Sequence, residues 1–183
     1  MRTITLTSAL IALTIIGNVV TKIPLFMGLE IRFGFVFFSA IAYLFGPVVA
    51  FAAGLIENTL SYIMGSGGFA GFDIRYGLNT GFAGIIYSIF LYRRNYKSEY
   101  FIIWIVSAKI AVNLICNIFI NTYLFRGYFG SLAEVITVSR VFKNIVLMPG
   151  EIIVMLIAIK YIAGSAYKYK FIKPPKGLMK NKP

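Results

Sequence analysis

The sequence has no histidine, one cysteine and few acidic residues. Cys116 is the only thiol, and Asp and Glu together number six. A disulfide framework and a metal site built from His and Cys ligands are therefore excluded. A hydrolase would want a nucleophile with a base in reach, and without histidine only rare lysine or carboxylate arrangements remain for that role. We expect a protein that is not an enzyme and that holds neither a metal nor a cofactor.

Charge of either sign is also scarce, whereas long apolar runs are abundant. Charged residues make up 13% of the chain and hydrophobic residues 59%, which is far from the composition of a soluble domain. A helix needs about 20 residues to cross a hydrocarbon core roughly 30 Å thick, so this length allows about six or seven crossings at most. We predict an all-α integral membrane bundle that forms one domain over residues 1–183.

Turn residues and charges divide the apolar runs into predicted helices. Six transmembrane spans are expected, at residues 3–20, 33–45, 48–64, 77–92, 100–125 and 142–162. The pair Gly46-Pro47 separates the second span from the third, and the glycine-rich stretch 65–68 opens a loop that continues to Arg75. The first run lacks the small-residue cleavage site of a signal peptide, and further apolar helices follow it immediately, so we interpret it as a span. Residues 165–183 form a basic tail.

Basic residues gather in three places that lie on one side of a six-span topology. These places hold Arg2, then Arg93, Arg94 and Lys97, then Lys168, Lys170, Lys173, Lys176, Lys180 and Lys182. The positive-inside rule makes that side cytoplasmic and puts both termini there. The net charge of +12 then follows mostly from topology and from attraction to anionic lipid headgroups. No RNA-binding fold accompanies the tail, so we expect membrane lipid and not nucleic acid as its partner.

The predicted outward loops carry charged residues close to the membrane. They hold Glu30, Arg32, Asp73, Arg75, Arg126, Glu134, Arg140 and Lys143. A charge at membrane depth costs roughly 2.5 to 3.5 kcal/mol at a helix centre, so it persists where it pairs or faces a polar cavity. Any one of these side chains could instead reach the headgroups. Together they predict a polar pocket that opens to the outside.

Two spans supply the expected walls of this pocket. The fifth carries a polar stripe at every fourth residue, formed by Lys109, Asn113, Asn117 and Asn121. Residues four apart share one face of a helix, and amides suit the edges of a heterocycle. The alternative is that the stripe forms interhelical hydrogen bonds that hold the bundle together. In the sixth span, one face carries Arg140, Asn144 and Glu151, with Lys143 beside it and a possible kink at Pro149-Gly150.

Small residues at four-residue or similar spacing mark two surfaces for close packing. Gly77, Gly81 and Gly84 on the fourth span permit another helix to approach closely, most simply within the bundle. Ser8 and Ala12 make a similar smooth stripe on the first span. Such a stripe can receive another subunit.

Seven short motifs are spread over nearly the whole chain. In chain order they are Arg32-Phe33-Gly34-Phe35, Leu44-Phe45-Gly46-Pro47, Gly71-Phe72, Gly84-Ile85-Ile86-Tyr87, Asn121-Thr122-Tyr123-Leu124, Arg140-Val141-Phe142-Lys143-Asn144 and Met148-Pro149-Gly150-Glu151. Together they resemble the folate family of substrate-binding S components from energy-coupling factor (ECF) vitamin transporters. Their order, spacing and six-helix setting carry the resemblance, since no single motif is specific.

The resemblance implies a subunit of the bacterial plasma membrane that captures a vitamin from outside and passes it to a shared module. That module comprises a transmembrane coupling protein and two cytoplasmic ATPases, and the S component is thought to topple in the membrane to release its cargo. No GxxxxGK[ST] phosphate loop is present in the sequence, so the energy must come from a partner. Ser8 and Ala12 occupy the place of the family's docking surface. A self-sufficient secondary transporter is the main rival, yet no repeat relates residues 1–92 to 93–183.

Folate fits the chemistry of the candidate pocket, because its pterin needs paired donors and acceptors, its aminobenzoyl ring needs flat walls and its glutamate needs cations. The three sets of candidates are Asn117, Asn121 and Glu151 for the pterin, Phe69, Phe72 and Tyr123 for the ring, and Arg32, Arg75, Arg140 or Lys143 for the carboxylates. Asn144 lies on the same face as Arg140. Ala70-Gly71-Phe72 replaces the family's usual Pro-Gly-Phe, so pantothenate or another anionic vitamin stays open as the cargo.

Overall fold

Helices make up nearly all of the computed structural model, which describes residues 2–21, 23–24, 30–66, 72–130, 132–172 and 174. The α-helices are α1 (Arg2–Val19), α2 (Gly34–Phe45), α3 (Pro47–Ser61), α4 (Ile74–Leu91), α5 (Phe101–Val112), α6 (Asn121–Phe129) and α7 (Leu132–Lys168), and the π-helical segments are η2 (Tyr62–Ser66) and η3 (Asn113–Ile120). Between α1 and α2, strand β1 (Ile23–Pro24) pairs antiparallel with β2 (Glu30–Ile31). The predicted all-α class is confirmed, and this short strand pair was not anticipated.

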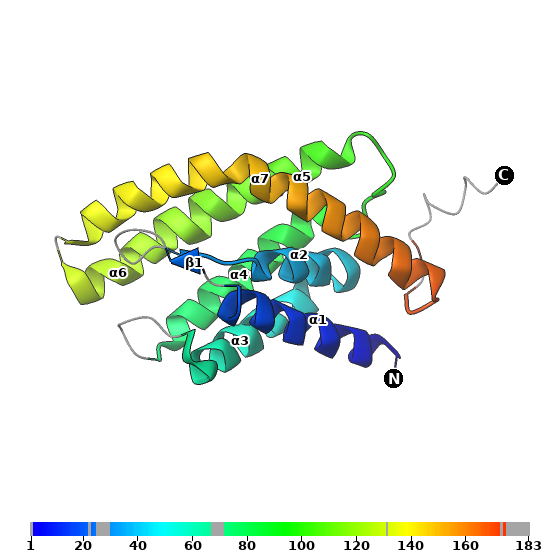
Figure 1. Ribbon diagram of the computed structural model, residues 1–183, viewed down its shortest axis with the longest axis horizontal. Helices are drawn as coiled ribbons and strands as arrows, with labels where there is room; N and C mark the ends of the chain where they lie inside the picture. Colours follow the sequence, from blue (N-terminus) through cyan, green and yellow to red (C-terminus); the bar gives the residue numbers. More distant parts are fainter. Residues whose placement is uncertain are drawn as a thin grey trace.

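The helices lie roughly along one axis, with α2 and α4 in the middle of the bundle (Figure 1). Helix α3 packs along α4, and α1 packs on both α2 and α3. On the opposite side, α7 contacts α2, while α5 contacts α4. The start of α1, the connection between α4 and α5, and the end of α7 all lie at one end of the bundle, which we call the basic end (Figure 1). The turn between α6 and α7 lies at the other end, called here the distal end (Figure 1).

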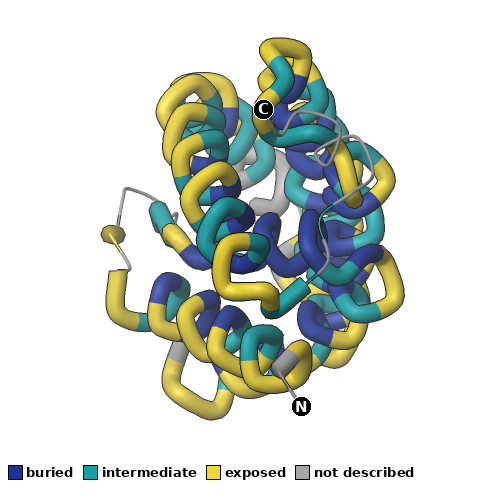
Figure 2. The backbone as a smooth tube through the Cα atoms, turned by 90° about the vertical axis from the view of Figure 1, so that its right-hand side faces the viewer, coloured by how far each residue is buried: buried dark blue, intermediate teal, exposed yellow. Residues whose placement is uncertain are grey.

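The length and apolar surface of the helices match a lipid environment. Among the described residues, three helical stretches are long and apolar enough to cross a membrane: Pro47–Gly65, Phe101–Tyr128 and Thr137–Lys168. Thr3–Val19 and Gly34–Phe45 are apolar but shorter. Exposed residues cover the outward faces and buried residues face the interior (Figure 2). Val48 and Phe119 are each 80% exposed, which suits contact with lipid.

Helix α7 begins earlier than the sequence indicated. The last span was expected to start at residue 142, but the helix starts at Leu132, directly after the turn at Gly130 with φ of +52°. Arg140 and Lys143 therefore project from a helix and not from an outward loop, and Arg126 likewise belongs to α6. Backbone groups at membrane depth must be satisfied within the segment, so the helix continues through these polar residues.

The tightest apolar packing lies toward the basic end. The large side chains that are fully buried there include Ile41 and Tyr43 from α2, Leu91 from α4, Phe101 and Ile105 from α5, and Met155 and Ile159 from α7. Tyr43 donates a hydrogen bond to the carbonyl of Arg94 at 2.8 Å, which ties α2 to the connection after α4. The interior of this half of the bundle is therefore mostly apolar.

Glycines set the distance between α3 and α4, as the small-residue spacing predicted for Gly81 and Gly84. A Cβ on Gly84 would lie 2.7 Å from the carbonyl oxygen of Ala50, and one on Gly54 would lie 2.8 Å from the backbone nitrogen of Gly81. Real side chains do not tolerate such approaches to backbone atoms. The two helices can therefore pack this closely only with glycine at the contact.

We expect Gly54→Ala to lower the thermal unfolding temperature of the purified protein in detergent. The added methyl group must push α3 away from α4, and overpacking of this kind costs about 1–3 kcal/mol. Gly127→Ala is the matched control, because a Cβ there meets nothing within 4 Å and alanine favours the helix. Equal unfolding temperatures for the two variants would contradict the close contact.

Candidate ligand-binding site

The predicted polar stripe faces the interior of the bundle. Lys109 and Asn113 are buried, with exposed fractions of 3% and 5%. Asn117 donates from Nδ2 to Oδ1 of Asn113 at 2.9 Å. The Oδ1 atom of Asn121 accepts a hydrogen bond from Asn79 of α4 at 3.1 Å. The stripe thus runs from the middle of the bundle toward the distal end and contacts α4 along the way.

A π-helical segment carries the central part of this stripe. Segment η3 contains both Asn113 and Asn117. Its wider hydrogen-bonding pattern changes how side chains at four-residue spacing line up, and such segments occur often at functional sites. The periodicity of the sequence alone does not predict the π-helical segment.

Lys109 and Glu151 form an ion pair in the interior, with 3.0 Å between Nζ and Oε2. The ammonium also lies 4.0 Å from the centroid of the Phe35 ring and interacts electrostatically with the hydroxyl of Tyr87. Helices α2, α4, α5 and α7 therefore meet at one lysine. A buried charge is tolerated only when it is paired in this way. Sequence analysis placed Lys109 and Glu151 on inward faces but missed Tyr87 and Phe35.

Two cations lie on α7 toward the distal end from this ion pair. The Arg140 guanidinium stacks on the Phe125 ring at 4.0 Å. Lys143 donates from Nζ to the carbonyl of Glu30 at 3.0 Å and so ties α7 to the strand pair. Asn144 beside it is buried, with 9% exposed.

The charges of this region act on one another. Lys143 is attracted electrostatically by Glu151 and repelled by Arg140, Arg32 and Lys109. Lys143 therefore lies within electrostatic range of three further cations, from α5, α7 and the segment before α2, and of the Glu151 carboxylate. We call this group, together with the amides of the stripe and Asn144, the polar cluster.

A second buried carboxylate lies between α1 and α3 and was missed by sequence analysis. Glu57 is 5% exposed and accepts hydrogen bonds from Asn18 at 2.6 Å and from Ser61 at 2.8 Å. Arg32 interacts with it electrostatically. The sequence does indicate Glu57 as a single acid within an apolar run, because an ionisable residue inside a membrane span needs a polar partner.

Arg75 is engaged outside the polar cluster. Its guanidinium lies 2.7 Å from Asp73, which caps α4 through the Arg75 backbone N–H, and it also donates to the hydroxyl of Tyr128 at 3.0 Å. The hydrogen bond from Arg75, with a further one from Tyr128, lowers the pKa of Asp73 to about 2. This arrangement ties the start of α4 to α6.

The structure brings some of the predicted site residues together and leaves others apart. Asn117, Asn121, Arg140, Lys143, Asn144 and Glu151 belong to the polar cluster. Arg32 pairs with Glu30 at 2.6 Å and contributes its charge to that cluster. Phe72 is 49% exposed and packs on Tyr62, and Tyr123 is 77% exposed. Phe69 lies outside the described residues. Ser8 and Ala12 are exposed on α1.

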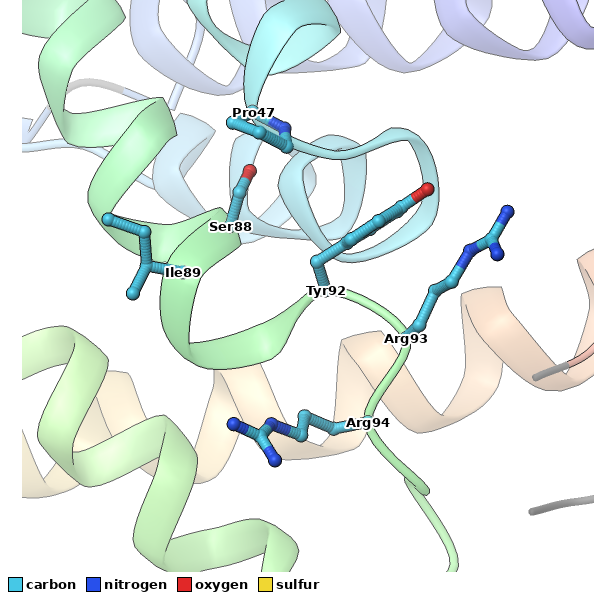
Figure 3. A pocket seen from close by; sticks show the side chains of 6 residues that line it. All are labelled: Pro47, Ser88, Ile89, Tyr92, Arg93 and Arg94. Atoms are coloured by element: carbon cyan, nitrogen blue, oxygen red, sulfur yellow. The ribbon is translucent and has the colours of Figure 1, made fainter. Parts of the chain in front are cut away.

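Two surface hollows lie away from the polar cluster. One of about 340 Å³ is at the basic end, lined by Pro47, Ser88, Ile89, Tyr92, Arg93 and Arg94 (Figure 3). The other, of about 330 Å³, lies on α3 and is lined by Leu55, Ile56, Thr59 and Leu60. Within the polar cluster, Lys109 pairs with Glu151 and Asn117 donates to Asn113. Other members are held by neighbouring residues, as Lys143 is by the Glu30 carbonyl and Asn121 by Asn79. A ligand that enters there must exchange these contacts for its own.

An apolar helical bundle with a buried, cation-rich polar cluster is typical of a membrane protein that binds a polar solute. A family model described as the S component of the ECF-type riboflavin transporter matches residues 1–164, and the chain belongs to this family. It is therefore a membrane-embedded transporter subunit, and its family is not a catalytic one. The resemblance to ECF S components drawn from the sequence is confirmed.

Comparison with solved structures supports the same fold. The crystal structure of FolT bound with folic acid matches with a TM-score of 0.70 and 22% sequence identity, over 85% of this chain and 90% of that one. No curated protein sequence matches significantly. At this level of identity the structural match concerns the fold.

Proposed function

We propose that this chain captures a vitamin, folate, from outside the cell and passes it to an ECF module for ATP-driven uptake. The partners in this proposal are a transmembrane coupling protein and two cytoplasmic ATPases. The chain crosses the membrane six times, with the basic end and both termini in the cytoplasm and the distal end outside. Family membership supports this arrangement, as does the common end at which the start of α1, the α4–α5 connection and the end of α7 lie (Figure 1).

The observation that carries the proposal is the gathering of cations in the polar cluster. Lys143 is repelled by Arg32, Arg140 and Lys109, and Glu151 is the carboxylate that attracts it. A bound carboxylate would relieve this repulsion, because charge-assisted hydrogen bonds from guanidinium and ammonium groups are the strong ones. The glutamate part of folate carries such carboxylates.

The remaining parts of folate have partners in the same region. We assign the pterin to Asn117, Asn121 and Glu151, whose amides and carboxylate offer both donors and acceptors. Arg140 and Lys143 take the carboxylates, with Asn144 beside them. Since Phe72 is about half exposed and Tyr123 largely exposed, we assign the flat walls for the aminobenzoyl ring to Phe35 and Phe125. These two rings already stack on Lys109 and Arg140.

Riboflavin is the second candidate, because the matching family model carries that vitamin in its description. Its ring system also presents paired donors and acceptors to amides. It has no carboxylate, however, and so offers Arg140 and Lys143 no anion with which to pair. Pantothenate has a carboxylate but no ring for the aromatic walls.

We assign the docking surface for the coupling protein to Ser8 and Ala12. Both side chains are exposed on α1, and small residues allow another helix to approach closely. This surface lies on the opposite side of the bundle from α5 and α7 (Figure 1).

Calorimetric titration of the purified protein with folate, riboflavin, pantothenate, thiamine and biotin tests the proposed cargo. We expect saturable binding of folate at the lowest concentration of the five. If riboflavin bound most tightly, riboflavin would replace folate as the proposed cargo. If none of the five vitamins bound, the proposal of vitamin capture would be contradicted. Uptake into vesicles by the chain alone, driven by an ion gradient and indifferent to ATP, would instead favour a secondary transporter.

A further inference from the structure

The hollow at the basic end has no part in the proposed vitamin site. It is formed by the start of α3, the last turn of α4 and the residues that follow (Figure 3). Polar and apolar groups both line it, with Arg93 and Arg94 among the polar residues and Pro47 and Ile89 among the apolar ones. A site of this mixed character suits a ligand that is itself part charged and part apolar.

The two arginines are held in place by aromatic rings and by the backbone. The Arg94 guanidinium lies 3.7 Å above the Trp104 ring, and that of Arg93 lies 5.2 Å from the Tyr92 ring. Arg93 has φ of 55°, a conformation that residues other than glycine seldom adopt. The side chains of Arg93 and Arg94 leave the chain in different directions (Figure 3).

Neither guanidinium has an acidic partner within the described part of the chain. The ion pairs found there join Arg32 to Glu30, Arg75 to Asp73, and Lys109 to Glu151. Arg93 and Arg94 therefore present positive charge beside the hollow, and the carbonyl of Arg94 is fixed by Tyr43. Two arginines whose charge is not neutralised by the protein form a natural partner for an anion.

The hollow also lies at the edge of the lipid-facing surface. Ile89, which lines it, is 65% exposed, and Val48, which follows Pro47, is 80% exposed. Exposed apolar side chains directly beside exposed arginines mark the boundary between the hydrocarbon core and the headgroups. An anion held here would have its apolar part against lipid-facing residues.

We propose that this hollow binds the phosphate of an anionic phospholipid, with the headgroup at Arg93 and Arg94 and an acyl chain along Ile89 and Val48. Guanidinium groups pair with phosphate through charge-assisted hydrogen bonds. A soluble phosphate ester would use the same arginines, but it would leave the apolar side of the hollow unused. The shared chemistry is thus a phosphate anion, and the lipid is the source that the apolar residues favour.

Trp104 provides a built-in reporter, since it is the only tryptophan in the chain and stacks under Arg94. The full-length protein is reconstituted in two sets of phosphatidylcholine vesicles. One set contains a small fraction of brominated phosphatidylglycerol and the other the same fraction of brominated phosphatidylcholine, and the brominated acyl chains of both lipids quench tryptophan on contact. We expect several-fold stronger quenching by the brominated phosphatidylglycerol. Arg93→Gln should remove most of this excess, and Arg93→Gln with Arg94→Gln should remove all of it.

The control is Lys168→Gln with Lys170→Gln, which removes the same charge from the same end but leaves the hollow intact. This control variant should keep the excess quenching by brominated phosphatidylglycerol. Calorimetric vitamin binding by each variant shows that the variant is folded. Equal quenching by the two brominated lipids would overturn the proposal, as would an equal loss in the lysine control, which would indicate only a general surface charge. Loss of the excess on addition of glycerol phosphate in solution would assign the site to a soluble phosphate ester instead.

Discussion

Lys109→Met should destabilise the protein strongly, and adding Glu151→Met to the same chain should restore most of that loss. The ammonium of Lys109 lies 3.0 Å from the Glu151 carboxylate, and Lys109 is almost completely buried. Removing one partner leaves the other charge uncompensated in the interior, which costs about 3–5 kcal/mol. Removing both replaces a buried ion pair with apolar side chains of similar volume, which is often neutral or even stabilising.

Thermal unfolding of the two single variants and the double variant in detergent measures this coupling. Lys160→Met is the matched control, because Lys160 is exposed on the same helix as Glu151 and should change the unfolding temperature little. If the losses of the two single variants simply add in the double variant, the two charges do not stabilise each other.

The same double variant separates a structural role of the pair from a role in binding. A protein that is as stable as the wild type but has lost vitamin binding would place Lys109 and Glu151 in the site itself, as we propose for Glu151 and the pterin. A stable double variant with unchanged binding would confine the pair to holding α5 against α7. Calorimetry on the double variant decides between these outcomes.

The sequence predicted the helices well because hydropathy is a strong signal for membrane spans. Runs of apolar residues bounded by Gly46-Pro47 or by clusters of arginine and lysine predicted α1 to α4 to within a few residues. The fifth predicted span, 100–125, covers α5, η3 and the first half of α6. The start of α7 was misplaced because polar residues such as Arg140 and Lys143 interrupt its apolar pattern. Inside a bundle such residues are paired with neighbouring elements, as Lys143 is with Glu30, and they do not end a helix.

Inward and outward faces near the ends of helices were harder to predict. Asn121 accepts a hydrogen bond in the interior, whereas Tyr123, two residues later, is 77% exposed. The π-helical turns of η3 alter the phase of the helix just before these residues, and no periodicity in the sequence reveals that change. The pairing of Glu57 with Asn18 joins residues far apart in the chain, so it too becomes visible only in the folded structure.

Arg140→Ala should weaken the binding of folate about ten- to a hundredfold while leaving riboflavin binding almost unchanged. A hydrogen bond to a charged group contributes about 1.5–3 kcal/mol, and each 1.4 kcal/mol corresponds to about a factor of ten in the dissociation constant. Folate has carboxylates that can pair with the guanidinium, whereas riboflavin has none. Calorimetric titration of the variant with both vitamins measures the two changes.

Arg140→Lys and Arg126→Ala make this prediction specific. Lysine keeps the charge but loses the two-pronged geometry of the guanidinium, so it should give an intermediate loss for folate. Arg126 is exposed on α6, and its removal should leave both affinities intact. An equal loss of folate and riboflavin in Arg140→Ala would mean that Arg140 acts through its packing on Phe125. No loss for either vitamin would remove Arg140 from the site and shift the carboxylate role to Lys143 or Arg32.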